Sequence, residues 1–266
     1  MFKIQKLNKI SPKGLELFPT ENYEYATDIN NPDAILVRSA KMHDMELPET
    51  LKAIARAGAG VNNIPIDKCS EKGIIVFNTP GANANGVKEL VLTGLFLSSR
   101  KVQQGIEWTK SLKGSSEDVS KVVEKEKSNY AGPEIKSKTL GIIGLGAIGV
   151  MVANDAVALG MDVIGYDPFI SVDAAWGLSS SVRKAISLDN VLTESDYISL
   201  HIPLNDETKG IINKNKFNIM KDNARLLNFA RGGLVDNNAL KDALESGKLA
   251  AYVTDFPDND LIEIDN

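Results

Sequence analysis

The chain has 266 residues, a hydrophobic fraction of 43%, a charged fraction of 24% and a formal net charge of -5. These values are typical of a soluble globular protein, and the length favours two domains over one. The acidic balance gives no basic surface for nucleic acid. The single cysteine, Cys69, excludes an internal disulfide framework, and the N-terminus lacks the apolar segment of a signal peptide, so we expect a cytoplasmic protein.

The first ninety or so residues alternate between strand-like and helix-like segments. Strands are expected at residues 2–4, 34–37, 51–55 and 73–77. Strands alternating with helices predict a parallel sheet with helical crossovers, in which ligands bind beyond the carboxyl ends of the strands. The polar and glycine-rich residues at those ends are Arg38, Ser39, Gly58, Ala59, Gly60, Val61 and Asn83.

Residues 85–110 have a broad apolar side and predict one long helix. A charged segment with three valines follows at residues 115–127. It fits a solvated surface helix, or a contact between subunits, because a protruding charged segment after a long helix suits an oligomerisation arm. Gly132 and Pro133 mark the break that follows.

The most informative segment is residues 139–167, which reads TLGIIGLGAIGVMVANDAVALGMDVIGYD. An apolar strand leads into Gly144, Gly146 and Gly149, spaced G-x-G-x-x-G, and apolar residues then recur at helical spacing until Gly160, a C-cap. A second apolar strand follows and ends in Asp167.

This order predicts a dinucleotide site. Gly144 permits the tight turn, Gly146 lets a pyrophosphate approach the backbone, and Gly149 lets helix and strand pack closely. The helix N-terminus attracts the phosphates. Asp167 can accept hydrogen bonds from the adenosine ribose and would repel a 2′-phosphate, which favours NAD over NADP. The alternatives are a glycine-rich turn in another α/β protein and a membrane span, and Asn154, Asp155 and Asp162 argue against the span.

Beyond Asp167 the alternation resumes, with strands expected at residues 185–188, 197–200, 225–228 and 250–254. Asp189, Asn213 and Asp236 are expected to begin the intervening helices. The ends of these strands supply His201, Thr208, Arg231, Asp255 and Asp260. An arginine near the nicotinamide end of a dinucleotide site suits a carboxylate substrate, a 2-hydroxy or 2-oxo acid, although a surface ion pair would also explain Arg231.

Over nearly its whole length the sequence resembles the D-isomer-specific 2-hydroxyacid dehydrogenases. The resemblance is carried by the glycine motif with Asp167 and by the segments LHIPLNDETKGIIN, NFARGGLVDNNALKDAL and AYVTDF. In the first lobe, LVRSA, ARAGAGVNNIPI and VFNTPGANANGVKEL resemble the branch that acts on 3-phosphoglycerate. The family implies an α/β fold of two Rossmann-like lobes with parallel sheets and a cleft between them. It also implies hydride transfer between NAD and the substrate carbon that bears the hydroxyl.

The resemblance also implies roles for single residues. Arg231 would hold the substrate carboxylate. Ala147, Ile148 and Asp167 would contact the adenosine half of NAD. The nicotinamide half would be lined by His201, Ile202, Pro203, Phe229, Ala230, Arg231 and Asp255. The first-lobe residues Arg38, Ser39, Gly58 to Val61 and Asn83 would face the substrate.

Two departures from the family concern its acid/base pair, a histidine oriented by a glutamate. Counted from Arg231, the glutamate position falls on Asp260, which is one methylene shorter. The family histidine lies in a Pro-His pair after a segment like EIDN, where this sequence ends. His201 could serve as a substitute acid, but the family places that position beside the cofactor. His43 fits a surface loop.

We therefore expect a substrate-binding lobe at residues 1–93 and an NAD-binding lobe at residues 94–266, with an oligomerisation arm at about 100–130. The expected protein is a homodimer or homotetramer that binds no metal, nucleic acid or membrane. The first hypothesis is NAD-dependent oxidation of a D-2-hydroxy acid, 3-phosphoglycerate to 3-phosphohydroxypyruvate in serine biosynthesis. The alternatives are a reductase for glyoxylate, hydroxypyruvate or pyruvate, and an NAD-sensing binding protein without catalysis. Fold similarity cannot separate these.

Overall fold

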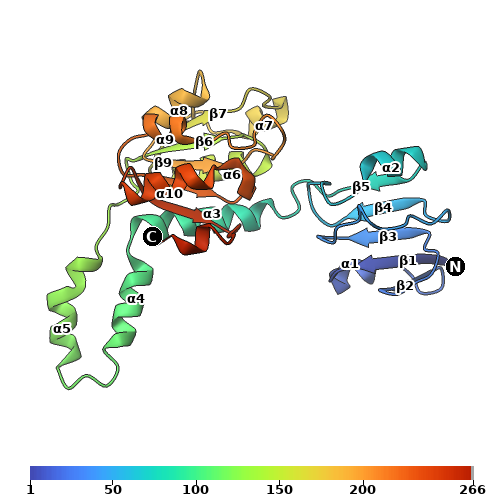
Figure 1. Ribbon diagram of the computed structural model, residues 1–266, viewed down its shortest axis with the longest axis horizontal. Coiled ribbons are helices and arrows are strands. Elements are labelled where there is room, and N and C mark those ends of the chain that lie inside the picture. Colours follow the sequence, from blue (N-terminus) through green and yellow to red (C-terminus); the bar gives the residue numbers. More distant parts are fainter. Residues whose placement is uncertain (265–266) are drawn as a thin grey trace. The chain divides into compact units, whose positions relative to one another are not determined.

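The computed structural model describes residues 1–264 and divides into two compact α/β units, Met1–Asn83 and Ala84–Asn266. Each unit is built on its own parallel sheet (Figure 1), as the sequence predicted for the fold class. The division falls before the helix at residues 84–99, whereas the sequence placed it within that helix, at residue 93.

The first unit is a five-stranded sheet in the order β2-β1-β3-β4-β5. Its elements are β1 Phe2–Leu7, α1 Pro12–Leu15, β2 Tyr23–Ala26, β3 Ala34–Val37, β4 Ala53–Arg56, α2 Ile66–Glu71 and β5 Ile75–Phe77. One sheet face carries the core, in which Ile35, Val37 and Ile54 are almost completely buried. On the strands' other face Ile75 and Phe77 stay 59% and 56% exposed. The unit therefore has one well-packed face.

The second unit is a six-stranded, fully parallel sheet in the order β11-β10-β9-β6-β7-β8. Its strands are β6 Thr139–Ile143, β7 Asp162–Tyr166, β8 Arg183–Lys184, β9 Tyr197–Leu200, β10 Ala224–Asn228 and β11 Leu249–Thr254. Its helices are α3 Ala84–Ser99, α4 Val102–Ser111, α5 Val119–Glu126, α6 Ala147–Ala158, α7 Val172–Gly177, α8 Leu188–Glu194, α9 Lys214–Ile219 and α10 Asn237–Glu245.

Helices cover both faces of this second sheet, and alternate strand residues point to opposite faces. On β9, Tyr197 packs with α3 and α6, whereas Ile198 and Leu200 pack with α8, α9 and α10. All three side chains are almost fully buried. Burial on both faces is why β6, β9 and β10 are apolar runs in the sequence.

The expected single helix at residues 85–110 is wrong, because α3 ends at Ser99 and α4 begins at Val102. The hydroxyls of Ser98 and Ser99 both donate to the Leu95 carbonyl oxygen and compete with the helical ladder. Lys101 leaves the helical conformation at ψ 50°. The end of α3 is anchored to the sheet instead, where Ser99 Oγ lies 2.7 Å from the Tyr197 hydroxyl.

Helices α4 and α5 form a hairpin that projects from the second unit (Figure 1). The expected charged helix is present as α5, and Asp118 caps its N-terminus. Trp108 of α4 stacks on Tyr130 at 4.9 Å between ring centroids, which holds the base of the hairpin together. Neither helix contains a buried residue.

Two further expectations need correction. No strand forms at residues 185–188; the edge strand of this region is β8, which has two residues and ends at Lys184. The cap of α8 is Ser187 rather than Asp189, because the Ser187 hydroxyl accepts from the Asn190 amide. Strand β2 was not expected at all. The caps expected at Asn213 and Asp236 are confirmed, as is the left-handed Gly160 (φ 80°) that ends α6.

Candidate functional site

The centre of the candidate site is the point where the second sheet reverses its strand order. Strands β7 and β8 follow β6 toward one edge, whereas β9, β10 and β11 extend toward the other. Ligands of open α/β sheets bind beyond the carboxyl ends of the strands at such a switch point. Here that point lies between Gly144, after β6, and His201, after β9, and the His201 amide donates to the Ile143 carbonyl oxygen at 2.7 Å.

The three motif glycines have distinct environments. Gly144 has φ 94°, and a Cβ there would lie 2.6 Å from the His201 carbonyl oxygen. A Cβ on Gly149 would lie 2.0 Å from the Gly144 carbonyl oxygen, so side chains are excluded from both positions. Gly146 is exposed and has no atom within 4 Å of a built Cβ. The open space in front of Gly146 is therefore where a ligand can approach the backbone.

The N-terminus of α6 is available to that ligand. Gly146 is its N-cap and provides no side-chain hydrogen bond, whereas α5, α7, α8, α9 and α10 are all capped by side chains. Ala147 is exposed, and Ile148 is half-buried in the core. Free amide groups and the helix dipole at this end suit a pyrophosphate.

Asp167 lies at the carboxyl end of β7, beside the glycine turn. Its two carboxylate oxygens accept from the Leu145 and Phe169 amides, each at 2.8 Å. These bonds fix the carboxylate and leave lone pairs for ribose hydroxyls. A cavity of about 500 Å³ opens here, lined by apolar residues such as Leu145 and Ile186 and by the charged Asp167, Arg183 and Lys184. The residues fit the adenosine half of NAD.

His201 stands on the other side of the switch point. Its Nε2 lies 2.9 Å from the Ser199 hydroxyl, and burial lowers the pKa of the ring to about 4. The imidazole is therefore neutral at pH 7. Ile202 packs on the core, and Thr208 is bound into its own loop, where its hydroxyl donates to the Pro203 carbonyl oxygen at 2.6 Å.

Arg231 follows β10, in the turn after Phe229 and Ala230. The guanidinium is half-buried and donates through Nη1 to the Ala230 carbonyl oxygen at 2.6 Å. In the described residues it forms no ion pair within 4 Å, so the alternative explanation of Arg231 as a surface salt bridge is not supported. The Phe229 side chain packs in the core against α3, which leaves mainly its backbone for a ligand.

The acidic residues after β11 lie at the same edge of the sheet. Partial desolvation raises the pKa of Asp255, and a backbone hydrogen bond and the positive charge of Arg231 oppose that rise. Asp260 is exposed, and within residues 1–264 its carboxylate accepts no hydrogen bond. Arg231 and Asp255 thus both follow the carboxyl ends of neighbouring strands, β10 and β11, whereas Asp260 has no side-chain partner among residues 1–264.

The candidate residues of the first unit lie at the carboxyl ends of its strands. The Asn8 side chain accepts from the Arg38 and Ser39 amides at 3.4 and 3.0 Å. The Gly58 amide donates to the Thr79 hydroxyl at 2.9 Å, and Asn78 donates to the Ala59 carbonyl oxygen. Gly60 and Val61 continue the same loop, and Asn83 ends the unit.

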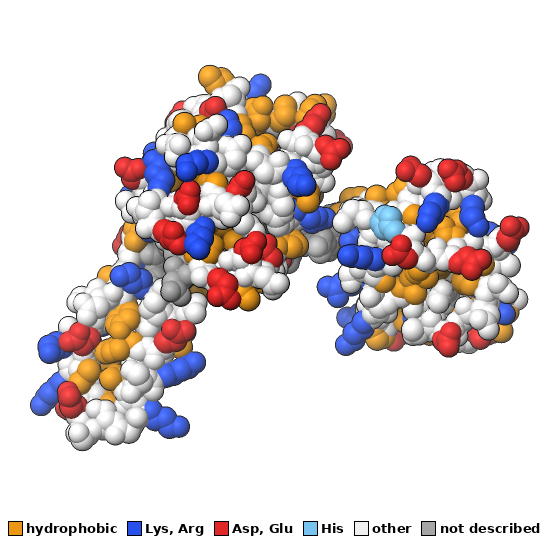
Figure 2. Space-filling view, viewed as in Figure 1, with side chains coloured by type: hydrophobic (Ala, Val, Ile, Leu, Met, Phe, Trp, Pro, Cys, Tyr) orange, Lys and Arg blue, Asp and Glu red, His pale blue; other side chains and the backbone are white. Residues whose placement is uncertain are grey.

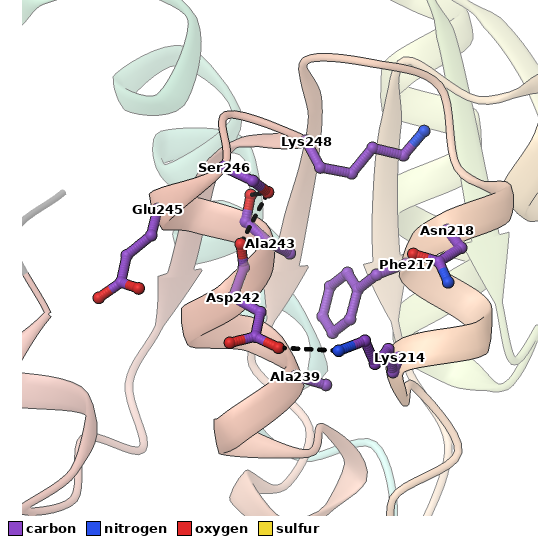
Figure 3. Close-up of a pocket in the computed structure, with 9 residues that line it drawn as sticks. All are labelled: Lys214, Phe217, Asn218, Ala239, Asp242, Ala243, Glu245, Ser246 and Lys248. Atoms are coloured by element: carbon purple, nitrogen blue, oxygen red, sulfur yellow. Dashed lines mark hydrogen bonds and ion pairs between the residues drawn. The ribbon is translucent and has the colours of Figure 1, made fainter.

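A second hollow, of about 470 Å³, lies between α9 and α10 and contains none of the predicted site residues (Figure 3). Its charges are already paired: Lys214 contacts Asp242 at 3.2 Å, and Lys248 contacts Asp222 at 2.8 Å. Across residues 1–264, no cluster of three or more acidic, histidine or cysteine side chains could hold a metal ion. None of the helices in that range is long and apolar enough to cross a bilayer.

Three residues near Arg231 were not singled out from the sequence. Asn228 is completely buried, and Tyr252 and Thr254 of β11 bond to it. The only available signal was a polar residue at the end of an apolar strand. Ser199, the partner of His201, was also missed.

Comparisons with known proteins agree with this geometry. Residues 93–266 match the family described as "D-isomer specific 2-hydroxyacid dehydrogenase, NAD binding domain". D-3-phosphoglycerate dehydrogenase of Archaeoglobus fulgidus is 37% identical over 253 residues, 91% of this chain and 45% of that protein. Hydroxypyruvate reductase of Thermotoga maritima is 40% identical over 234 residues, 87% of this chain and 71% of that protein.

Among solved structures, the NAD+-bound 3-phosphoglycerate dehydrogenase of Entamoeba histolytica aligns with a TM-score of 0.74 and 27% identity, over 97% of this chain and 81% of that one. The chain spans about half the length of the curated phosphoglycerate dehydrogenases that it matches. The glycine turn, Asp167 and Arg231 occupy the carboxyl edge of a parallel sheet in a segment that matches the family's NAD-binding domain. The chain therefore belongs to the D-isomer-specific 2-hydroxyacid dehydrogenase family.

Proposed function

We propose that the protein oxidises a D-2-hydroxy acid with NAD, and that the acid is 3-phosphoglycerate. The observation that carries this proposal is the convergence, at one sheet edge, of an open glycine turn, a fixed acceptor for ribose and an arginine that forms no ion pair with any of residues 1–264. These are Gly146, Asp167 and Arg231. The product would be 3-phosphohydroxypyruvate, an intermediate on the route to serine.

Each residue has a distinct task in this proposal. Bound NAD supplies the hydride acceptor. The amides at the start of α6 hold its pyrophosphate, and Asp167 holds its adenosine ribose and disfavours a 2′-phosphate. His201, Ile202, Pro203, Thr208, Ala230 and Asp255 line the nicotinamide side. Arg231 binds the substrate carboxylate through two parallel hydrogen bonds and thereby orients the reacting carbon. Asp260 takes the place of the family's orienting glutamate, and Arg38, Ser39, Gly58 to Val61 and Asn83 bind the rest of the acid.

The choice of acid rests on the relatives. Several relatives at 34–38% identity are D-3-phosphoglycerate dehydrogenases, whereas the hydroxypyruvate reductase is 40% identical. A reductase that acts on hydroxypyruvate, glyoxylate or pyruvate is therefore the second candidate function. Turnover of these acids with NADH, measured beside 3-phosphoglycerate oxidation with NAD, distinguishes the two.

Binding of the acid tests the role of Arg231. Arg231→Lys keeps the charge but loses the planar fork, and Arg231→Ala loses both. Loss of a charged hydrogen bond costs about 1.5–3 kcal/mol, or roughly one to two decades of affinity. Calorimetric titration of 3-phosphoglycerate into the NAD-saturated protein should show this loss in both variants. Arg225→Lys, at the opposite end of β10, is the matched control, and an unchanged affinity in Arg231→Ala would remove Arg231 from the site.

Turnover separates catalysis from cofactor sensing. Neither His43 nor His201 matches the family's acid/base histidine, and a positioned base contributes about 10²–10⁴-fold. We expect a polypeptide of residues 1–266 to bind NAD with little turnover, and an engineered extension that appends the family's Pro-His segment to be active. Full activity of residues 1–266 that is lost in His201→Ala would make His201 the acid/base. NAD binding without turnover in the extended polypeptide would instead favour the cofactor-sensing protein.

We also propose that the hairpin of α4 and α5 joins two copies of the chain. Val102, Ile106 and Val119 are 46%, 51% and 45% exposed, and Figure 2 shows apolar side chains along the hairpin between charged ones. Exposed apolar stripes of this kind mark association sites. Sedimentation should show a dimer or tetramer that Ile106→Glu dissociates and the control Lys110→Glu does not. A monomeric parental protein would contradict this role.

A further inference from the structure

We propose that Asn228, which is buried, and Tyr252, which is half-buried, form a polar clamp that positions the Arg231 turn and so sets the affinity for the substrate acid. This inference rests on the proposed role of Arg231 and adds two positioning residues to it. Both residues lie in the sheet of the second unit, on the neighbouring strands β10 and β11.

Asn228 holds the turn at both of its ends. Its side-chain oxygen accepts from the Ala230 and Arg231 amides at 3.2 and 3.3 Å, and its side-chain amide donates to the Arg231 carbonyl oxygen at 2.8 Å. One side chain thus bonds to both backbone groups of the arginine. Because Asn228 is completely buried, these bonds are shielded from water.

Tyr252 fixes the remaining donor of Asn228. The second hydrogen of the Asn228 amide points to the Tyr252 hydroxyl at 3.1 Å, so the amide cannot turn without losing this partner. The Thr254 hydroxyl adds a bond to the Asn228 carbonyl oxygen at 2.9 Å. Burial raises the pKa of Tyr252, so its hydroxyl keeps its proton at neutral pH. The strands β10 and β11 are therefore linked by side chains at the point where the Arg231 turn leaves the sheet.

The clamp matters for binding because the arginine fork must match a carboxylate in plane and distance. The guanidinium reaches the substrate from a backbone whose amide and carbonyl groups are both held by Asn228. If this backbone were loosened, the turn would have to become ordered when the acid binds. The free energy of that ordering would reduce the affinity, although every atom that touches the acid would still be present.

The alternative is that the hydroxyl of Tyr252 only stabilises the fold. A matched tyrosine separates the two roles. Tyr197 is buried in the second unit, and its hydroxyl bonds to Ser99 Oγ at 2.7 Å, but it lies on strand β9 and away from the Arg231 turn. Tyr252→Phe and Tyr197→Phe make the same chemical change, one in the clamp and one outside it.

The test uses the full chain saturated with NAD. Two quantities are measured: the affinity for 3-phosphoglycerate by calorimetry, and hydrogen exchange of the Ala230 and Arg231 amides by mass spectrometry. In Tyr252→Phe we expect acid binding about three- to tenfold weaker, as for one lost hydrogen bond, together with faster exchange and unchanged NAD affinity. The isosteric Asn228→Asp, which removes both donors, should have a larger effect in the same direction. Tyr197→Phe should lower the unfolding midpoint but leave both quantities unchanged.

The outcomes separate this inference from the proposed function. If Arg231→Ala leaves acid affinity unchanged, or the parental protein does not bind the acid, the function assigned to Arg231 fails, and the exchange data alone decide whether the clamp exists. If Arg231→Ala abolishes binding while Tyr252→Phe changes neither affinity nor exchange, the clamp is wrong and the function stands. Faster exchange with unchanged affinity would overturn the claim that the clamp sets affinity.

Discussion

The two sheets of the molecule are built from similar strands but are stabilised to different extents. The second sheet buries one apolar cluster on each face, under α3 and α6 on one side and α8, α9 and α10 on the other. The first sheet has a single cluster of nine buried residues, and Phe2, Ile75 and Phe77 remain more than half exposed. Parallel sheets are normally covered on both faces.

The helices differ in the same way. In the second unit five helices begin with a side-chain cap, and α6 lacks one where the cofactor is expected. In the first unit neither Ser11 before α1 nor Pro65 before α2 caps its helix. Helix α4 of the projecting hairpin also begins without a side-chain cap, so among the helices α6 to α10, which pack on the second sheet, only α6 lacks one. The dinucleotide site is therefore built on the better-packed unit, at the N-terminus that no side chain occupies.

Separating the units should have the largest effect. Residues 84–266 contain both core clusters of the second sheet and every predicted NAD contact. They should therefore melt cooperatively and bind NAD as the whole chain does. Residues 1–83 should show no cooperative transition, since a core of this size rarely supplies more than about 3–5 kcal/mol. Circular dichroism melts and NAD calorimetry on the two fragments measure this. A cooperative first fragment beside an unfolded second one would reverse the comparison.

Glycine substitutions should next divide folding from binding. Gly149→Ala places a Cβ against the Gly144 carbonyl oxygen and should cost about 1–3 kcal/mol or more of unfolding free energy. Gly146→Ala meets open space, so it should fold normally and weaken NAD binding by about tenfold or more, which is 1.4 kcal/mol. Gly14→Ala in α1, also in open space, is the control and should be neutral or stabilising.

Burial of His201 should make the stability of the second unit depend on pH. Burial holds the pKa of His201 at about 4, below the ordinary 6.5, whereas His43 is exposed. Between pH 6.5 and 4 the unfolded chain binds more protons at this position, so stability is complete above pH 6.5 and falls as the pH drops toward 4, by at most about 3 kcal/mol. Urea unfolding across this range should show a slope that His201→Asn reduces and His43→Asn does not. An identical slope in His201→Asn would place the titration elsewhere.

Much of the second unit was predictable because the residues that determine its turns and helix caps lie close together in the sequence. The glycine turn and the acid that ends β7 lie within one segment of sequence, and Asn213 and Asp236 cap helices two or three residues away. β3 was predicted with its observed bounds because its apolar run of four residues is too short for a helix and has polar residues at both ends.

The features that the sequence did not predict depend on contacts between residues far apart in the chain. The apolar pattern continues through residue 102, whereas α3 ends at Ser99, which is anchored to Tyr197, 98 residues away. β2 is recognised only by its pairing with β1, and the Asn228–Tyr252 bond joins residues 24 apart on different strands. In the site, the positions of the motif residues were predictable, whereas the partners that hold them were not.

The smallest predicted effect concerns a cap that the sequence placed two residues too late. The Ser187 hydroxyl accepts from the Asn190 amide at 3.1 Å, so Ser187→Ala should lower the unfolding free energy of the second unit by about 1 kcal/mol. Asp189 contributes an exposed ion pair with Lys216 instead, and Asp189→Ala should cost less. Ser11→Ala tests the first unit, where no cap bond exists to be lost. In thermal unfolding, Ser187→Ala should therefore be less stable than Asp189→Ala, and Ser11→Ala should be as stable as the parental protein. A loss of stability in Ser11→Ala as large as that in Ser187→Ala would show that serine caps stabilise the helices of both units.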